Sequence, residues 1–352
     1  MTAHTRSRKG QEGIALLIVL LFVAILMALV IEFTYETQVE TSQVSANVND
    51  FDALIAAKSG VASGMSLLIQ DLILGVTGQQ NDTKKDSGSE SERQGAELYD
   101  SLDEVWALGT PFQKINNGVM QCSIEDEFGK LNLNALFNSR AQEPREDVVE
   151  ILRRLIEARQ GDPSVVDAII DWLDEDDDPQ PMGAESDYYQ QMPVPYRAKN
   201  GPMSSVEELL LVRGITPELF FGNGTVDQLP LTELLTVYGH RSGRVNANTA
   251  QHELLVAVGE AIGQPGIADI ILEERETAPF MSMSDLETRG IQQPREEEGQ
   301  VQFRPFVIAS SAFRIQGNGM SGRSKVRIEA FVRRDTQGGP DGFRILDWRE
   351  VR

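Results

Sequence analysis

The sequence predicts an α+β fold: a long N-terminal helix packed on an antiparallel sheet, with an all-α domain inserted into the sheet-forming part. Three observations predict it. A run of 18 uncharged residues passes without a break into an amphipathic helical pattern. Residues 303–352 alternate apolar and polar positions between turn-forming segments. Between these two regions lies a helical stretch in which a set of short sequence phrases occurs twice.

The uncharged run extends from Ile14 to Ile31 and follows a basic leader that contains Arg6, Arg8 and Lys9. At ~1.5 Å of rise per residue this helix would span ~27 Å, close to the hydrocarbon thickness of a bilayer. A cleaved secretory signal would end in small residues, but this run is followed directly by Glu32 and aromatic residues. The run therefore predicts a retained transmembrane helix, with the basic N-terminus on the cytoplasmic side.

The helical pattern continues beyond the membrane segment. Residues 32–49 contain neither Gly nor Pro, and an apolar face then follows at helical spacing. This face comprises Phe51, Leu54, Ile55, Val61, Ala62, Met65, Leu68 and Ile69. Gly60 and Gly64 either let a sheet approach the helix closely or merely weaken it. We expect one helix over residues 14–75, with residues 14–31 in the membrane.

The sheet is expected in two separate parts of the chain. Residues 76–134 begin with a polar, Gly/Ser-rich linker without secondary structure (76–95). A strand that buries Met120, Cys122 and Ile124 then follows within residues 104–134. Residues 296–352 supply three short antiparallel strands. Turns are predicted at residues 317–319 (Gly-Asn-Gly) and 338–342.

Residues 135–295 read as helices joined by short loops, arranged as a degenerate repeat. The sequence Gly-Lys-Leu-Asn-Leu-Asn at 129–134 corresponds to Gly-Arg-Val-Asn-Ala-Asn at 243–248. Each copy closes on an Arg-Gly-Ile phrase, at 213–215 and 289–291. The Asn residues and the Ser before each closing helix are expected to cap helices, and each closing Gly suits a left-handed C-terminal position. The pattern predicts two packed helix-hairpin-type units.

The two copies differ most at an acidic insertion, residues 171–201, which the second copy lacks. Between Asp171 and Asp187 there are eight carboxylates and no Lys or Arg. A solvated charged face is the alternative interpretation, but Trp172 and three tyrosines flank the run and five Pro and Gly residues fold it tightly. Converging carboxylates need a hard cation, and ligands that are all oxygen favour Ca²⁺. The spacing does not fit an EF-hand loop.

Composition excludes several function classes. The net charge of −22 and the pI of about 4.6 argue against nucleic-acid binding. Cys122 is the only cysteine, so no intrachain disulfide forms. No nucleophile or nucleotide-binding motif accompanies His4, His240 or His252, which we interpret as surface histidines. We expect a protein that is not an enzyme.

A basic leader, a Gly and then a retained apolar helix resembles the leader of type IV prepilins and pseudopilins. The resemblance implies cleavage after Gly13 by a prepilin peptidase and methylation of the new N-terminal Ile14. Most pilins carry Glu at the fifth mature position, where this chain has Ile18. That departure, together with the inserted helical repeat, is similar to the K-type minor pseudopilins of type II secretion.

This resemblance covers nearly the whole chain and implies several further properties. The fold would be a pseudopilin fold with a duplicated SAM-like insert, and the partners would be the I-, J- and H-type pseudopilins at the pseudopilus tip. The chain would be a single-pass inner-membrane protein with its globular part in the periplasm. The acidic insertion is similar to the calcium-binding loop of this family, which points to Asp174, Asp176 and Glu185 as ligands, then Asp178 and Asp187. Asp171 is expected either to share this role or to cap or brace the loop around Trp172.

Two other functions remain open on the sequence. One is a minor pilin of a type IV pilus, acting in adhesion or in priming assembly. The other is a membrane-anchored, calcium-dependent binding module unrelated to pili.

Overall fold

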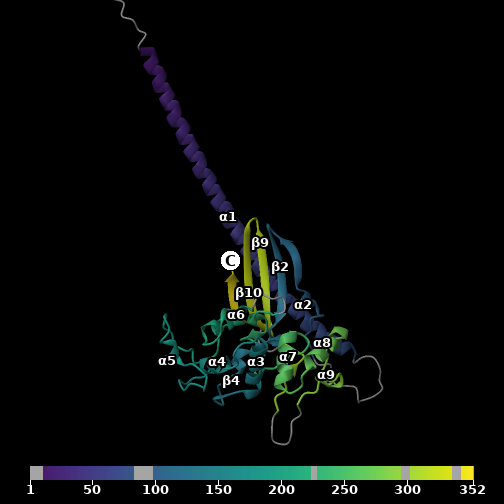
Figure 1. Ribbon diagram of the computed structural model, residues 1–352. Helices are drawn as coiled ribbons and strands as arrows, with labels where there is room; N and C mark the ends of the chain where they lie inside the picture. Colours follow the sequence, from purple (N-terminus) through teal and green to yellow (C-terminus); the bar gives the residue numbers. More distant parts are fainter. Residues whose placement is uncertain (1–10, 83–97, 223–227, 295–301, 335–341, 352) are drawn as a thin grey trace, which may run out of the picture.

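A computed structural model describes residues 11–82, 98–222, 228–294, 302–334 and 342–351. The predicted leader lies largely outside these ranges, as do most of the predicted linker and the predicted turn at 338–342. The molecule has three parts along one axis (Figure 1): a projecting helix, a sheet laid against its second half, and a helical insert at the far end of the sheet.

The N-terminal half is a single helix, α1 (Gln11–Asp82), as the unbroken pattern predicted. It continues past residue 75, so the first residues of the predicted linker are helical. Every side chain from Ile14 to Val48 is exposed. Within the described ranges this is the one helix long and apolar enough to cross a membrane.

The sheet has five antiparallel strands in the order β1-β2-β9-β10-β11. They are β1 (Thr110–Ile115), β2 (Gly118–Asp126), β9 (Ala312–Ser321), β10 (Ser324–Arg334) and β11 (Phe343–Val351), with the short helix α2 (Val105–Leu108) preceding them. β2 and β9 are neighbours although 185 residues separate them, since Asp126 lies opposite Phe313. The chain therefore leaves and re-enters the sheet at one point.

Small residues bring α1 and the sheet together. The buried positions of the helix include Ala53, Ala57 and Val61, whereas Phe51 and Ala62 of the predicted apolar face are exposed. A Cβ added to Gly60 would lie 2.9 Å from the Gln121 carbonyl oxygen. The glycines of the helix thus allow close approach of the sheet, which was one of the two interpretations of the sequence.

The predicted turn at residues 317–319 is wrong, because these residues lie in the middle of β9. A Cβ on Gly317 would be 2.2 Å from the Ala57 carbonyl oxygen, and one on Gly319 would be 1.9 Å from that of Ala53. These glycines are present because the helix backbone lies against them. The actual turn follows Ser321, where Gly322 has a φ of 55°.

The segment between β2 and β9 forms the insert, which is wider than the expected 135–295. Its larger helices are α3 (Glu146–Ala158), α4 (Val165–Leu173), α7 (His252–Ala261) and α8 (Ile267–Thr277). The shorter ones are α5 (Ser186–Tyr189), α6 (Pro217–Phe221), α9 (Met283–Thr288) and the 3₁₀ helices η1 (Glu127–Gly129), η2 (Leu133–Ala135), η3 (Val206–Leu211) and η4 (Leu231–Glu233). Two-residue strands are β3 (Leu131–Asn132), β4 (Phe137–Asn138), β5 (Glu143–Pro144), β6 (Leu235–Thr236), β7 (Val245–Asn246) and β8 (Phe306–Val307).

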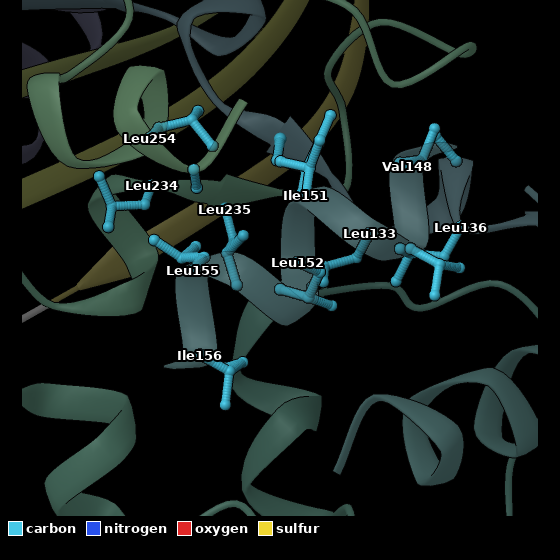
Figure 2. Packing of buried hydrophobic residues seen from close by; sticks show 14 of the residues in the cluster. Leu133, Leu136, Val148, Ile151, Leu152, Leu155, Ile156, Leu234, Leu235 and Leu254 are labelled. Atoms are coloured by element: carbon cyan, nitrogen blue, oxygen red, sulfur yellow. The ribbon is translucent and has the colours of Figure 1, made fainter. Parts of the chain in front are cut away.

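The insert has a continuous apolar core of its own. Figure 2 shows Ile151, Leu152 and Leu155 of α3 packed with Leu234, Leu235 and Leu254 from the later part of the insert. All six side chains are at most 1% exposed. A second, separate core forms between α1 and the sheet around Trp106, Phe313 and Ile328.

The predicted repeat is present in atomic detail. In the first copy, the Asn134 side chain donates to the Met203 carbonyl (3.0 Å) and accepts from the Met203 N–H (2.7 Å). In the second, Asn248 makes the same pair of bonds with Phe280, at 3.0 and 2.8 Å. Each copy also contains one parallel two-strand pairing, β3 with β6 and β7 with β8.

The expected helix ends are partly confirmed. Gly214 and Gly290 both have a left-handed φ, at 85° and 94°. Ser282 caps α9 by accepting from the Asp285 N–H, but Ser205 makes no side-chain cap bond. The closing units of the two copies are therefore similar in backbone and differ in capping.

Candidate metal centre

The acidic insertion of the first repeat follows directly from α4. Asp171 lies in the last turn of this helix, and Asp174 is the residue at which the helix ends. The chain then runs out through the insertion and returns at Glu185, immediately before α5. The two helix ends therefore carry carboxylates toward each other.

Three of these carboxylates converge. Oxygens of Asp171, Asp174 and Glu185 lie within 4.8 Å of one another, and the three residues are 0, 3 and 5% exposed. No hydrogen-bond partner reaches Asp171 Oδ2, Asp174 Oδ1 or either oxygen of Glu185, although all four atoms are buried. Buried carboxylate oxygens without donors are costly unless a cation neutralises them.

The buried carboxyl groups of the cluster also have raised pKa values. Burial, together with the neighbouring aspartates Asp176 and Asp171, raises the pKa of Asp174 to about 7. Burial and the charges of Asp171 and Asp174 raise the pKa of Glu185 to about 8. In the absence of a cation, protons would therefore be held here near neutral pH.

Asp171 uses its two oxygens differently. Its Oδ1 accepts from the Gln180 N–H at 3.0 Å, which braces the loop as one interpretation of the sequence expected. Its Oδ2 faces Gly183, where an added Cβ would lie 1.8 Å from that oxygen. Gly183 is therefore required for the loop to close over Asp171.

Aromatic side chains hold the loop in place. The buried ring of Tyr189 lies edge-on to Trp172 (5.4 Å between centroids) and stacks on Tyr196 (5.1 Å). Arg213 donates to the Gly183 carbonyl at 3.0 Å, and its guanidinium lies over the Tyr188 ring. The acidic run is thus part of the folded insert; Asp171, Asp174 and Glu185 are buried in it, whereas the other carboxylates form the solvated face that was the alternative interpretation.

The structure brings together only some of the predicted ligands. Asp174 and Glu185 lie in the buried cluster, and Asp171 completes it. Asp176, Asp178 and Asp187 are exposed, and the group of three does not include them.

The contact of Asn200 with the acidic run was not predicted. The Asn200 side chain donates to the Asp176 carbonyl at 2.6 Å, while its Oδ1 is buried without a partner. Asn200 itself has a left-handed φ of 46°. No pattern in the sequence marks it out from other loop asparagines.

The donor set fits a hard divalent cation. It consists of oxygens only, with three carboxylates and no Cys or His, which disfavours Zn²⁺ and suits Ca²⁺. The three residues would hold the ion, with carbonyl or water oxygens completing a coordination number of about six to eight.

A helix with a fully exposed apolar first half, laid against an antiparallel sheet by its second half, is the architecture of the class that contains pilins and pseudopilins. Comparison with known proteins identifies the branch of this class. Two family models, both described as "Type II secretion system (T2SS), protein K", match this chain, one over residues 129–221 and the other over residues 245–303. The chain belongs to the type II secretion system protein K family.

Its relatives support this assignment over most of the chain. The type II secretion system protein K of Pseudomonas aeruginosa is 30% identical over 305 residues, covering 84% of this chain and 81% of that protein. The protein K of Klebsiella pneumoniae is 27% identical over 60% of each chain. A chain in the crystal structure of the GspK-GspI-GspJ complex from enterotoxigenic Escherichia coli has the same fold, with a TM-score of 0.59 at 17% identity, over 91% of this chain and 99% of that one.

Proposed function

We propose that this chain is a structural subunit at the tip of the type II secretion pseudopilus, bound there to the I- and J-type pseudopilins and placed above the H-type. The observation that carries this is the position of the insert. It occupies the end of the sheet that lies farthest from the apolar half of α1 (Figure 1). A subunit cannot stack on that end without meeting the insert. Membership in the protein K family favours this function over a type IV pilus subunit or an unrelated calcium-binding module.

The N-terminal segment fits the same function. We propose that a prepilin peptidase cleaves after Gly13, that Ile14 is then methylated, and that residues 14–31 anchor the chain in the inner membrane with the globular part in the periplasm. The exposed apolar half of α1 supports this, and the basic leader sets the direction. Ile18 replaces the Glu of most pilins, which is expected if no subunit lies above this one.

A calcium ion at Asp171, Asp174 and Glu185 is the second part of the proposal. The observation in its favour is the set of four buried carboxylate oxygens without donors. The ion would neutralise the cluster and join the end of α4 to the start of α5, so its role would be to order the insert. Asp176 is near enough to raise the pKa of both Asp174 and Glu185, and is the first candidate for a further ligand among the exposed residues.

Co-purification tests the proposed assembly. The full-length chain is expressed with the I- and J-type pseudopilins of the same organism and purified in detergent. We expect one stable complex that contains one copy of each. Recovery of this chain alone, or only with the major pseudopilin of the shaft, would contradict the proposal.

A further inference from the structure

Five exposed or half-buried arginines lie near one another on a chain whose net charge is −22. We call this group the arginine patch; its members are Arg145, Arg241, Arg244, Arg333 and Arg344. They come from the start of α3, the loop before β7, the end of β10 and the start of β11. Segments distant in sequence thus bring these arginines together, beside the exposed Glu146 and Asp147 in the first turn of α3.

Packing explains why these segments meet. Tyr238 lies on Phe331, with 4.5 Å between ring centroids, which holds the loop at 238–244 against the end of β10. In that loop, Gly243 lies directly on Val148 of α3, since an added Cβ would be 2.6 Å from its side chain. This contact draws the start of α3 to the same loop. Arg333 and Arg344 face each other across the β10–β11 pair.

The arginines of the patch lack acidic partners within the described residues. Other arginines of the chain are paired, such as Arg159 with Glu253 at 2.6 Å and Arg334 with Asp100 at 2.7 Å. No ion pair in the described ranges involves a member of the patch, and the Nε atoms of Arg145 and Arg244 are buried without hydrogen-bond partners.

The repeat supplies an internal comparison. Lys130 and Arg244 occupy the same position in the two copies of the Gly-basic-x-Asn phrase. Lys130 is 7% exposed and contacts Glu127 at 3.2 Å and Glu125 at 3.3 Å. Arg244 has no such partner, and together with Arg145 it helps lower the pKa of the half-buried His240 to about 4, after burial itself. His240 is thus partly buried, not a surface histidine as expected, and it adds no positive charge at neutral pH.

The patch costs stability in the isolated chain. Like charges directly opposite each other on neighbouring strands are destabilising, and Arg333 faces Arg344 in this way. Burial and the charges of Arg241 and Arg344 lower the pKa of Arg333. Unpaired cations that repel one another are expected where an anionic surface binds.

The distance of the arginine patch from the membrane segment decides whether the anionic surface belongs to a lipid or to a protein. Arg334, next to Arg333, contacts Asp71 of α1 at 3.3 Å. Asp71 follows Ile31 by 40 residues (71 − 31). At ~1.5 Å per residue of helix, the patch lies ~60 Å along α1 from the apolar run. Lipid head groups at that membrane are therefore out of reach, and a protein surface is favoured.

We propose that the arginine patch docks a carboxylate-rich surface of the I- and J-type pseudopilin pair. This inference rests on the proposed function, which supplies the partner. The patch then sets the orientation of the insert relative to the two partners and contributes charge-dependent affinity.

The test compares two charge-reversed variants of the full-length chain in detergent. R241E/R344E changes two exposed members of the patch, and R323E/K325E makes the same change of charge at two exposed positions near the opposite end of the sheet. The probe is the purified I–J pair, with affinity measured at low and high salt. We expect R241E/R344E to bind about tenfold or more weakly with little salt dependence, and R323E/K325E to bind like the unaltered chain.

Stability separates this effect from misfolding. Arg344→Glu replaces a like-charge pair with an opposite-charge pair across from Arg333, so the patch variant should unfold at the same or a higher temperature.

Equal binding by both variants would overturn the role of the patch while leaving the proposed function intact. Failure of the unaltered chain to bind the pair would overturn the proposed function itself. Unchanged partner binding with lost binding to phosphate or to phosphatidylglycerol vesicles would assign the patch to a phosphate ligand instead.

Discussion

Asp171 shows how a single residue can serve both the fold and the candidate site. Its Oδ1 accepts a hydrogen bond from the Gln180 N–H, and its Oδ2 is buried without a donor. The sequence suggested both roles but ranked Asp171 behind Asp176, Asp178 and Asp187. Composition shows that carboxylates are dense here, but which of them are buried depends on how the end of α4 packs against the start of α5, and that is a tertiary property.

Glu185→Gln provides the sharpest test of the cluster, because it removes charge and keeps shape. We expect calcium affinity to fall about tenfold or more, and the thermal stabilisation by calcium to decrease correspondingly. Asp187→Asn is the matched control, as it removes one exposed carboxylate from the same loop. Titration calorimetry of the full-length proteins measures the calcium affinity of each variant, and melting temperatures with and without calcium measure the stabilisation. Equal losses in the two variants would mean that the loop binds calcium diffusely.

The raised pKa values of Asp174 and Glu185 predict an unusual pH dependence in EDTA. Their ordinary values are 3.8 and 4.5, and the folded values are about 7 and about 8. The folded state binds the protons more tightly, so this contribution to stability is complete below about pH 4 and is lost as the pH rises through 7 to 8.

Melting temperatures measured in EDTA should therefore fall between pH 5 and pH 8 for the unaltered chain. Calcium should reduce or reverse this trend, because it replaces the protons. Glu185→Gln should flatten it, since the variant has one fewer group to titrate. A melting temperature in EDTA that rises steadily up to pH 8 would show that these carboxyl groups are not held in their protonated form.

At the scale of elements, the sequence predicted the strong periodicities correctly. The single helix, the β2 strand with buried Cys122 and Ile124, and the repeat all follow from local pattern. The contact between α1 and β9 does not. This contact is made by Ala and Gly, which carry little apolar signal. The predicted apolar face therefore included the exposed Phe51, and a turn was wrongly predicted at Gly317, within β9. A glycine required by close packing cannot be told from a turn glycine without knowing what lies opposite.

Gly319→Ala tests this contact. The new Cβ would lie 1.9 Å from the Ala53 carbonyl oxygen, so helix and sheet must separate, at a cost of about 1–3 kcal/mol. Gly201→Ala is the control, because its nearest neighbour is 3.9 Å away. Urea unfolding of the two proteins in detergent compares them. Equal stability of both variants would show that α1 and β9 are less closely packed.

At the scale of the molecule, the two cores have distinct tasks. The core between α1 and the sheet forms the pseudopilin part, and the core around α3 and α7 forms the insert. Buried polar bonds join them: Asp126 at the end of β2 accepts from Thr249 (2.6 Å), Asn246 (3.0 Å) and Ser310 (2.6 Å). The insert is therefore fixed to the end of the sheet, as the proposed block to further stacking requires.

The position of this chain in assembled pseudopili tests that account most directly. The insert is labelled with an antibody fragment, and labels are counted along fibres by electron microscopy. We predict one label at one end of each fibre. A variant in which a short hairpin loop replaces residues 127–311, joining β2 to β9 where Asp126 faces Phe313, should lose this restriction when tagged at its C-terminus. Labels of the intact chain spread along the shaft would contradict the account.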